Sequence, residues 1–180
     1  NNFQVLLIKI IFFVNPIALN VFKWYVVYTH PNFEKKVYNS LQQRDIISFL
    51  PLKKMIRQWS DRKKTIESPL FPNYLFVYTT VHDRFKVLEI PGTARYISFN
   101  NSPVTITDNE IEMIKKMMTD PHVMIENCLE GDAVKITEGP FTGLTGIIFE
   151  RKGRTRFGVK LNVIKQSISV EFNRSSIVKI

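Results

Sequence analysis

Residues able to do acid–base or nucleophilic chemistry are few and widely separated in this sequence. The three histidines, His30, His82 and His122, form no pair at a spacing typical of metal ligands, and Cys128 is the single cysteine. No glycine-rich phosphate-binding motif of the GxGxxG or GxxxxGK[ST] type is present. We therefore expect a protein that is not an enzyme and that uses no metal and no cofactor.

Two enzymatic alternatives use these residues. A hydrolase or nuclease would combine His82 with a carboxylate such as Asp83 or Glu89, although no ordered set of acid, base and metal ligand accompanies them. Cys128 would need a histidine partner to act as a nucleophile, and a lone cysteine in a linker is more often inert. Because one cysteine cannot form an intramolecular disulfide, the sequence fits a reducing compartment.

Basic residues give the strongest indication of a partner. The 180-residue chain has a net charge of +9 and a pI near 9.7, which favours nucleic acid and, second, an acidic membrane surface. A predicted hairpin at 53–67 could bind a phosphate backbone. Alternatively, its lysines only keep an exposed ribbon soluble. The hairpin cations are Lys53, Lys54, Arg57, Arg62, Lys63 and Lys64.

Large aromatic side chains gather in the stretch SPLFPNYLFVYT, residues 68–79. A strand here would place Tyr74, Phe76 and Tyr78 on one face, and the two aliphatic residues between them on the other, which is the better core face. Pro72 cannot donate a ladder hydrogen bond, so the strand should begin after it. The aromatic face is either core packing or a docking surface for a partner.

Hydrophobic periodicity predicts the elements that hold these residues. Strands are predicted at 23–29, 46–52, 74–79 and 94–99, and the hairpin has its turn near 60–61. A helix with the apolar stripe Phe33, Val37 and Leu41 follows the first strand. A short helix is predicted within 81–92, and a further helix at 107–118.

The C-terminal third changes character. Five short alternating runs follow residue 129, which is typical of a small five-stranded β-barrel. The expected fold class is α+β, with an antiparallel α/β sandwich at 23–118, a linker at 119–128 and the barrel at 129–180. Within the barrel, Gly139-Pro140 and Gly143 would hold Phe141 at a loop tip, as a lid on the barrel or as a contact for a partner.

The first 22 residues stand apart. Phe3–Val14 is strongly apolar but is interrupted by Lys9, and about 20 apolar residues are needed to span a membrane. The segment is an appended or upstream-translated extension, a signal or anchor, or a packed first element. Membrane association through it is one alternative; we expect no stable association.

Two motifs carry a resemblance to a known family. GDAVKITEGPFTGLTGII at 131–148 resembles the KOW motif, and KWYVVYT with LFPNYLFVY resembles the N-terminal (NGN) domain of NusG-type transcription elongation and antitermination factors. The resemblance covers about 23–180. Asn73 replaces a usual glycine of the general factor, and Lys165-Gln166 replace its Gly-Arg pair, so the chain is most similar to specialised paralogs of the RfaH and UpxY type.

The resemblance implies a fold, a function and partners. The fold would be an NGN domain followed by a KOW barrel, with the barrel rather than an RfaH-like helical hairpin as the resting form. The protein would be a cytoplasmic, monomeric bacterial factor that docks on the clamp helices of RNA polymerase and suppresses pausing. The implied polymerase-binding patch is Tyr28, Phe71, Tyr74, Phe76, Ile111 and Ile114.

Further partners follow from the same resemblance. His82, Arg84 and Lys86 would join the hairpin in contacting non-template DNA or nascent RNA, although ordinary solvent exposure is the alternative. Phe141, Val163 and Ile164 would contact a small-subunit ribosomal protein. A general NusG-type factor, or a ribosome-associated KOW protein that binds RNA, are the other functions to consider.

Overall fold

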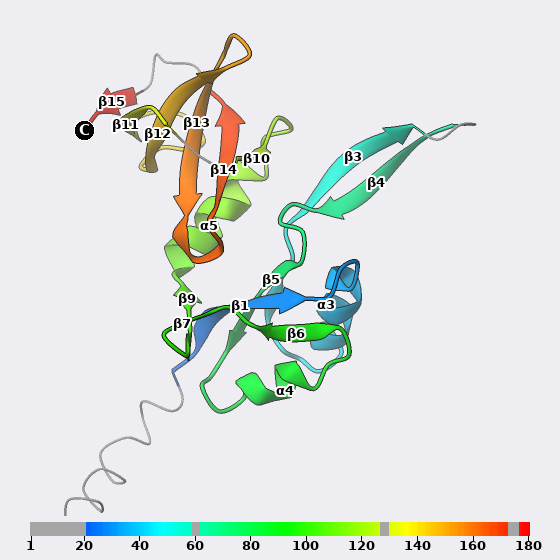
Figure 1. Ribbon diagram of the computed structural model, residues 1–180. Coiled ribbons are helices and arrows are strands. Elements are labelled where there is room, and N and C mark those ends of the chain that lie inside the picture. The colour runs from blue at the N-terminus through cyan, green and yellow to red at the C-terminus, as the bar shows by residue number, and fades with distance from the viewer. Residues whose placement is uncertain (1–20, 59–61, 127–129, 173–176) are drawn as a thin grey trace, which may run out of the picture.

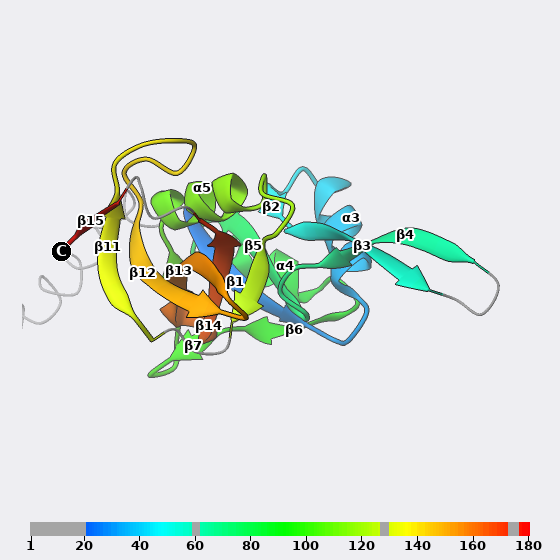
Figure 2. The same ribbon diagram turned by 90° about the horizontal axis from the view of Figure 1, so that it is seen from above.

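The computed structural model describes residues 21–58, 62–126, 130–172 and 177–180. The apolar segment Phe3–Val14, the predicted turn at 60–61 and Cys128 therefore lie outside the described residues. Two antiparallel sheets are arranged on either side of helix α5 (Asp108–Met117), and a two-stranded ribbon projects from the N-terminal sheet (Figures 1 and 2).

The N-terminal sheet is centred on two aromatic, β-branched strands. Strands β1 and β5 pair antiparallel along their length, with Val26 opposite Phe76, as expected for strands of this composition. The order is β2-β5-β1-β6, and β9 also pairs with β1. The bounds are β1 (Lys23–Thr29), β2 (Ser48–Phe49), β5 (Tyr74–Thr79), β6 (Thr93–Tyr96) and β9 (Thr105–Ile106).

Both faces of this sheet are buried, which confirms the alternation predicted for β5. Leu75 and Val77 belong to one hydrophobic cluster, with helix α3 (Glu34–Gln42) and helix α4 (Arg84–Leu88) on that side. Phe76 belongs to a second cluster on the other face, where α5 packs. The strand therefore supplies core residues to two layers at once.

Helix α5 begins where the sequence predicts. Thr107 and Glu110 form a reciprocal capping box, in which the Glu110 amide donates to Thr107 Oγ1 at 3.2 Å and the Thr107 amide donates to Glu110 Oε2 at 2.9 Å. Trp24 Nε1 also donates to Asp108 Oδ1 at 2.9 Å. These bonds fix the helix start against β1.

The predicted strand at 46–52 is wrong in extent. Only Ser48 and Phe49 pair with β5, and Leu52 begins the ribbon instead, because Pro51 between them has no amide to donate. The ribbon consists of β3 (Leu52–Gln58) and β4 (Lys63–Pro69). A second, much smaller hairpin follows β6, formed by β7 (Ser98–Phe99) and β8 (Ser102–Pro103).

The C-terminal sheet has six strands rather than five. Residues 124–126, expected in a linker, form the added strand and pair with β14, and the order is β10-β14-β13-β12-β11-β15. Among the described residues this pairing runs as an open path. The bounds are β10 (Met124–Glu126), β11 (Asp132–Ile136), β12 (Thr145–Arg151), β13 (Arg154–Leu161), β14 (Gln166–Glu171) and β15 (Ile177–Lys179), with the 3₁₀ turn η1 (Asn162–Ile164) before β14.

The lengths of the helices bear on the membrane alternative. Within the ranges that the structure describes, none of the helices is both long enough and apolar enough to cross a bilayer.

Candidate functional site

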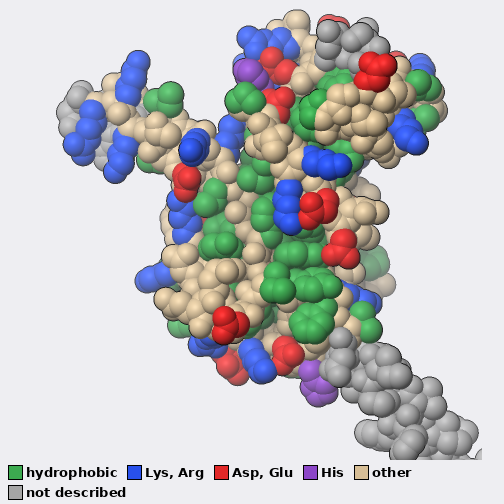
Figure 3. All heavy atoms as spheres, turned by 180° about the vertical axis from the view of Figure 1, so that it is seen from behind, with side chains coloured by type: hydrophobic (Ala, Val, Ile, Leu, Met, Phe, Trp, Pro, Cys, Tyr) green, Lys and Arg blue, Asp and Glu red, His purple; other side chains and the backbone are tan. Residues whose placement is uncertain are grey.

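The projecting ribbon carries an exposed group of basic side chains. Lys54, Arg62, Lys63 and Lys64 are exposed, and Figure 3 shows basic side chains along the arm that stands away from the body. Lys53 differs, because it is half-buried at the ribbon base and its ammonium donates to the carbonyl of Val123. The ribbon therefore presents cations to solvent at a distance from both cores.

The register of the ribbon brings like charges together. Arg57 is directly opposite Lys64, whereas Lys54 is opposite Glu67. Like charges directly opposite each other destabilise a strand pair.

The basic residues near α4 have close neighbours at the same short helix. Lys86 forms an ion pair with Asp83 at 2.6 Å, which raises the pKa of Lys86 and holds the pKa of Asp83 below its usual value. The guanidinium of Arg84 lies 5.3 Å from the ring centroid of Phe85. His82 is exposed. These three residues surround one short helix, as the sequence predicts, but Lys86 is already neutralised by a neighbour.

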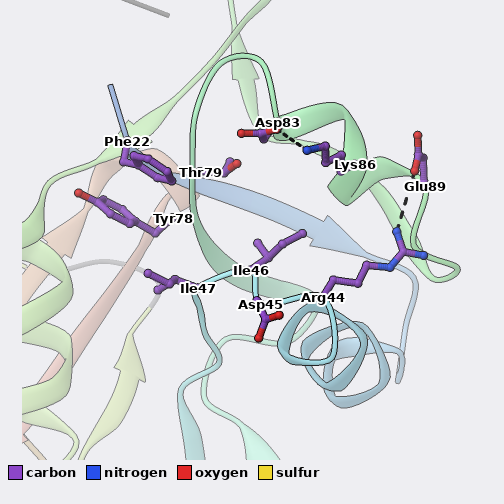
Figure 4. Close-up of a pocket in the computed structure, with 10 residues that line it drawn as sticks. All are labelled: Phe22, Arg44, Asp45, Ile46, Ile47, Tyr78, Thr79, Asp83, Lys86 and Glu89. Atoms are coloured by element: carbon purple, nitrogen blue, oxygen red, sulfur yellow. Dashed lines mark ion pairs between the residues drawn. The ribbon is translucent and has the colours of Figure 1, made fainter. Parts of the chain in front are cut away.

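A pocket of about 670 Å³ opens beside α4. Figure 4 shows Phe22 against Tyr78 on one side, with ring centroids 5.5 Å apart, and two ion pairs on the other. Asp83 pairs with Lys86, and Glu89 pairs with Arg44 at 3.9 Å.

The contacts of this pocket bear on the hydrolase alternative. Both carboxylates considered for it are engaged with basic side chains. No group of three or more His, Cys, Asp or Glu that could hold a metal occurs in the described part of the chain. His82 is not among the residues that line the pocket, so the structure does not bring it together with both carboxylates there.

Most of the predicted polymerase-binding patch is buried. Phe71, Phe76 and Ile114 are fully buried, and Ile111 is 1% exposed. The rings of Phe71 and Phe76 meet edge to face, with centroids 6.1 Å apart. The structure therefore brings these four residues together, as the resemblance implies, but inside one hydrophobic cluster rather than at the surface.

The two tyrosines of the patch form its accessible rim. Tyr28 and Tyr74 are half-buried, and their rings meet edge to face at 5.3 Å. Arg95 lies 5.1 Å from the Tyr28 ring centroid. Burial, with Tyr28 close by, raises the pKa of the Tyr74 phenol, while Arg95 opposes the shift. Both rings present an apolar body and a hydroxyl, a combination common in protein interfaces.

Asn73 holds this rim in place, a role that the sequence did not reveal. Its φ of 68° lies in the left-handed region, which asparagine tolerates better than most residues. Its amide donates to Oε1 of the buried Glu34 at 2.8 Å, and its side-chain Nδ2 donates to the Tyr28 hydroxyl at 3.3 Å. A backbone angle in this region suits glycine or asparagine better than most other residues.

The predicted contact residues of the C-terminal sheet belong to the same hydrophobic cluster. Phe141 and Ile164 are buried, and Val163 is partly buried against the cluster. Gly139 and Gly143 take φ values of 84° and 85°, as expected for the turns that hold Phe141. Phe141 is thus a packed side chain here and not a free loop tip.

The seam between α5 and the C-terminal sheet joins the two predicted protein-binding surfaces. A groove runs between them, with Met113 and Lys116 of α5 on one side and Leu144 and Val159 on the other. The hydrophobic cluster continues from Phe76 through α5 into the sheet. Most of both surfaces is covered in this conformation, with Tyr28 and Tyr74 the accessible part.

Comparison with known proteins identifies the family. The family model described as "Transcription termination factor nusG" matches residues 22–115, which is more than half of the chain. The chain belongs to the NusG family. Proteins of this family are transcription factors and not enzymes, in agreement with the poor set of catalytic residues in the sequence.

Curated relatives extend the match over most of the chain. A NusG termination/antitermination protein of Pseudomonas aeruginosa is 25% identical over 178 residues, covering 88% of this chain and 98% of that protein. The protein of the same name from Campylobacter jejuni is 26% identical over 182 residues, covering 90% of this chain and 99% of that protein. The NusG resemblance therefore extends to both sheets.

A solved structure shows that the fold is shared. The structure described as "Domain interaction in Thermotoga maritima NusG" is 24% identical, covers 89% of this chain and 98% of that one, and has a TM-score of 0.54. The antiparallel N-terminal sheet with its helices and the C-terminal all-β part are thus an NGN-type and a KOW-type unit. The specialised RfaH or UpxY type is a finer assignment than family membership.

Sequence reasoning missed the polar contacts that hold the linker of this NusG-family chain. Arg156 is 3% exposed, and its Nη2 donates to the carbonyl of His122 at 2.8 Å and to the carbonyl of Ser169 at 3.0 Å. An arginine in an alternating strand gives no signal that distinguishes a buried guanidinium from an exposed one. Its role appears only once β13 and β14 are placed beside the linker.

Proposed function

We propose that this NusG-family chain is a transcription elongation and antitermination factor of the bacterial cytoplasm. It binds RNA polymerase and suppresses pausing and termination. The observation that carries the proposal is the family match over residues 22–115, together with relatives named as termination/antitermination proteins over nearly their whole length. The exposed ribbon and the aromatic rim supply the two kinds of surface that this activity needs.

The ribbon is proposed to contact nucleic acid beside the polymerase. Its exposed lysines can neutralise phosphates and release counterions, a contribution that does not depend on sequence. Non-template DNA or nascent RNA is the ligand. Arg84 and His82 would form a second contact at α4, separate from the ribbon, whereas the ion pair with Asp83 weakens the case for Lys86.

The aromatic patch is proposed to bind the polymerase clamp helices in two steps. Tyr28 and Tyr74 are accessible first, because they are half-buried in this conformation. Phe71 and Phe76 would become available only when the hydrophobic cluster that they share with α5 opens. A domain interaction is described for the Thermotoga maritima NusG, which supports a comparable contact here.

Residues 129–180 are proposed to form a separate unit, with 23–118 as the other. Once separated, it would offer Phe141, Val163 and Ile164 to a small-subunit ribosomal protein. We propose an operon-specific paralog over the general factor because Lys165 occupies a left-handed position, with φ of 52°, where the general factor has glycine. Asn73 does not strengthen this choice, since glycine and asparagine suit its backbone equally.

The experiment is a binding and pausing assay with RNA polymerase core enzyme. Tyr74→Ala should raise the Kd of the full chain about 5- to 150-fold, because a central aromatic anchor is worth about 1–3 kcal/mol. The same variant should lose its effect on pause duration in single-round transcription.

The matched control is Tyr38→Ala. Tyr38 is also a half-buried tyrosine, but it lies on α3 and packs against the other cluster. Tyr38→Ala should lower the free energy of unfolding about as much as Tyr74→Ala does and leave the Kd for the polymerase unchanged. Equal Kd values for the wild type and folded Tyr74→Ala would show that the aromatic rim is not the polymerase contact.

A further inference from the structure

The linker between the two sheets is fastened at two polar points. The carbonyl of His122 accepts a hydrogen bond from buried Arg156 at 2.8 Å, on the side of the C-terminal sheet. The next carbonyl, that of Val123, accepts one from Lys53 at the base of the ribbon. The Val123 side chain is itself buried, at 3% exposure. Residues 122–123 therefore connect the ribbon to the C-terminal sheet.

The strand that follows is short. β10 has three residues, and it pairs with the edge of β14 from Met124 opposite Ser169 to Glu126 opposite Ser167. Short edge strands have few hydrogen bonds to lose and open locally at low free-energy cost. Whether β10 stays paired should therefore depend on the bonds just before it, including the one from Lys53.

Lys53 also belongs to the basic group of the ribbon. It is next to exposed Lys54, and a groove beside the two lysines is lined by linker residues Thr119–Pro121 and Val123. An ammonium binds an anionic phosphate more strongly than a neutral carbonyl, because the bond is assisted by charge on both partners. A phosphate that reaches the ribbon base would compete with Val123 for the Lys53 ammonium.

We propose that Lys53 is a latch through which nucleic acid on the ribbon releases the linker from the ribbon base. With the Val123 carbonyl free, β10 opens more often, and the seam between α5 and the C-terminal sheet loosens. This inference rests on the proposed nucleic-acid contact and adds its regulation. Because coupling between two equilibria is reciprocal, a chain whose linker is already released should bind nucleic acid more tightly through Lys53.

Hydrogen exchange on the full chain tests the latch. The probe is a mixed-sequence single-stranded DNA of about 20 nucleotides, and the readout is exchange of the Met124–Glu126 amides by mass spectrometry. Saturating DNA should speed exchange of these amides in the wild type about 3- to 10-fold. Lys53→Met, which keeps the aliphatic stem, should show the faster exchange without DNA, and DNA should add no further increase.

Lys54→Met is the matched control on the same strand. It removes an exposed ammonium, so DNA should bind more weakly, but exchange of Met124–Glu126 without DNA should equal that of the wild type. At saturating DNA the increase should still occur. Amides of β1 and β5 should exchange equally in all three proteins, which excludes global unfolding as the cause.

The outcomes separate the latch from the function on which it rests. If the wild type binds DNA and exchange of Met124–Glu126 does not change, or if Lys53→Met exchanges like the wild type without DNA, the latch is wrong while the ribbon contact stands. If the wild type does not bind DNA under low salt, the nucleic-acid contact itself is wrong, and the latch falls with it.

Discussion

The basic ribbon and the aromatic patch were both predicted as binding surfaces, yet the structure treats them in opposite ways. The ribbon stands in solvent with Lys54, Lys63 and Lys64 exposed, whereas Phe71 and Phe76 are fully buried. Desolvating unpaired charges is expensive, so cations remain in water until an anion arrives. Burying apolar rings away from water lowers the free energy, whatever the apolar surface that covers them. Other parts of the chain therefore cover such a patch when no partner is bound.

The difference in exposure between the ribbon and the patch affects how each surface could bind a partner. The exposed cations of the ribbon are already in solvent, so the first step of the proposed nucleic-acid contact should depend mainly on salt. On the proposed function, the buried part of the patch would have to exchange one apolar contact for another, so polymerase binding would include the cost of opening the cluster shared with α5. The stability of the free chain and its affinity for the polymerase would then be opposed.

The largest expected effect compares one apolar residue from each region. Phe76→Ala should lower the free energy of unfolding by about 3–5 kcal/mol, because it empties a fully buried ring position in the core. Ile56→Ala on the ribbon should change it by about 0.5 kcal/mol or less, since Ile56 is 73% exposed. Urea denaturation followed by far-UV circular dichroism measures both.

A small loss of stability in Phe76→Ala would remove the distinction between a buried patch and an exposed ribbon. If Phe76→Ala costs less than about 1 kcal/mol, the ring is not held in a packed core in solution, and the patch is open in the free chain. In that case polymerase affinity should not carry an opening cost.

The elements of the N-terminal sheet were largely predictable from local pattern. Alternation in 74–79 and the Thr107 and Glu110 capping signal place β5 and α5 correctly, because these signals lie within the elements themselves. What covers the Phe76 face was not predictable. The same alternating aromatics suit a core, an interface or both, and only the position of α5 and the C-terminal sheet decides between them.

The candidate site, too, could be predicted from the sequence only in part. The cluster of ribbon cations was visible in the sequence, but the partner of Lys53 is Val123, 70 residues away. A backbone carbonyl carries no residue-type signal, so no pattern could single it out. The three-residue strand β10 was missed for a related reason: it exists because β14 offers an edge, and not because its own sequence alternates.

The second prediction compares the loss of unfolding free energy on replacing a buried cation, Arg156, and an exposed one, Lys63. Arg156→Met should cost about 2–3 kcal/mol of unfolding free energy, because the His122 and Ser169 carbonyls lose a donor in a buried site. Burial lowers the pKa of Arg156, and nearby Glu171 opposes this shift, so the guanidinium stays charged. Lys63→Met on the ribbon should cost less than about 0.5 kcal/mol.

Arg154→Met is the control within the C-terminal sheet. Its guanidinium pairs with Glu171 at 2.5 Å but its side chain is 63% exposed, so the loss should stay below about 1 kcal/mol. Denaturant unfolding of the three variants gives the order. Should Arg154→Met cost as much as Arg156→Met, the ion pair with Glu171, and not the bonds to the linker and Ser169, would account for the effect.

The smallest effect tests why the ribbon keeps its repulsive register. Lys64→Glu places an acid opposite Arg57 and should stabilise the ribbon by about 0.2–1 kcal/mol, whereas Lys54→Glu places an acid opposite Glu67 and should destabilise it by a similar amount. Both variants change the net charge equally, so both should weaken DNA binding to a similar extent. Local opening free energies from hydrogen exchange of the β3 and β4 amides measure the stability difference.

These two variants separate stability from binding on the same ribbon. A ribbon that becomes more stable and binds DNA less well in Lys64→Glu holds its like charges for the ligand and not for the fold. If both variants shift the β3 and β4 amides in the same direction, the cross-strand charges do not set ribbon stability, and the like-charged register is no argument for an anionic partner. The ribbon and the aromatic patch would then differ only in how far their side chains are exposed to solvent.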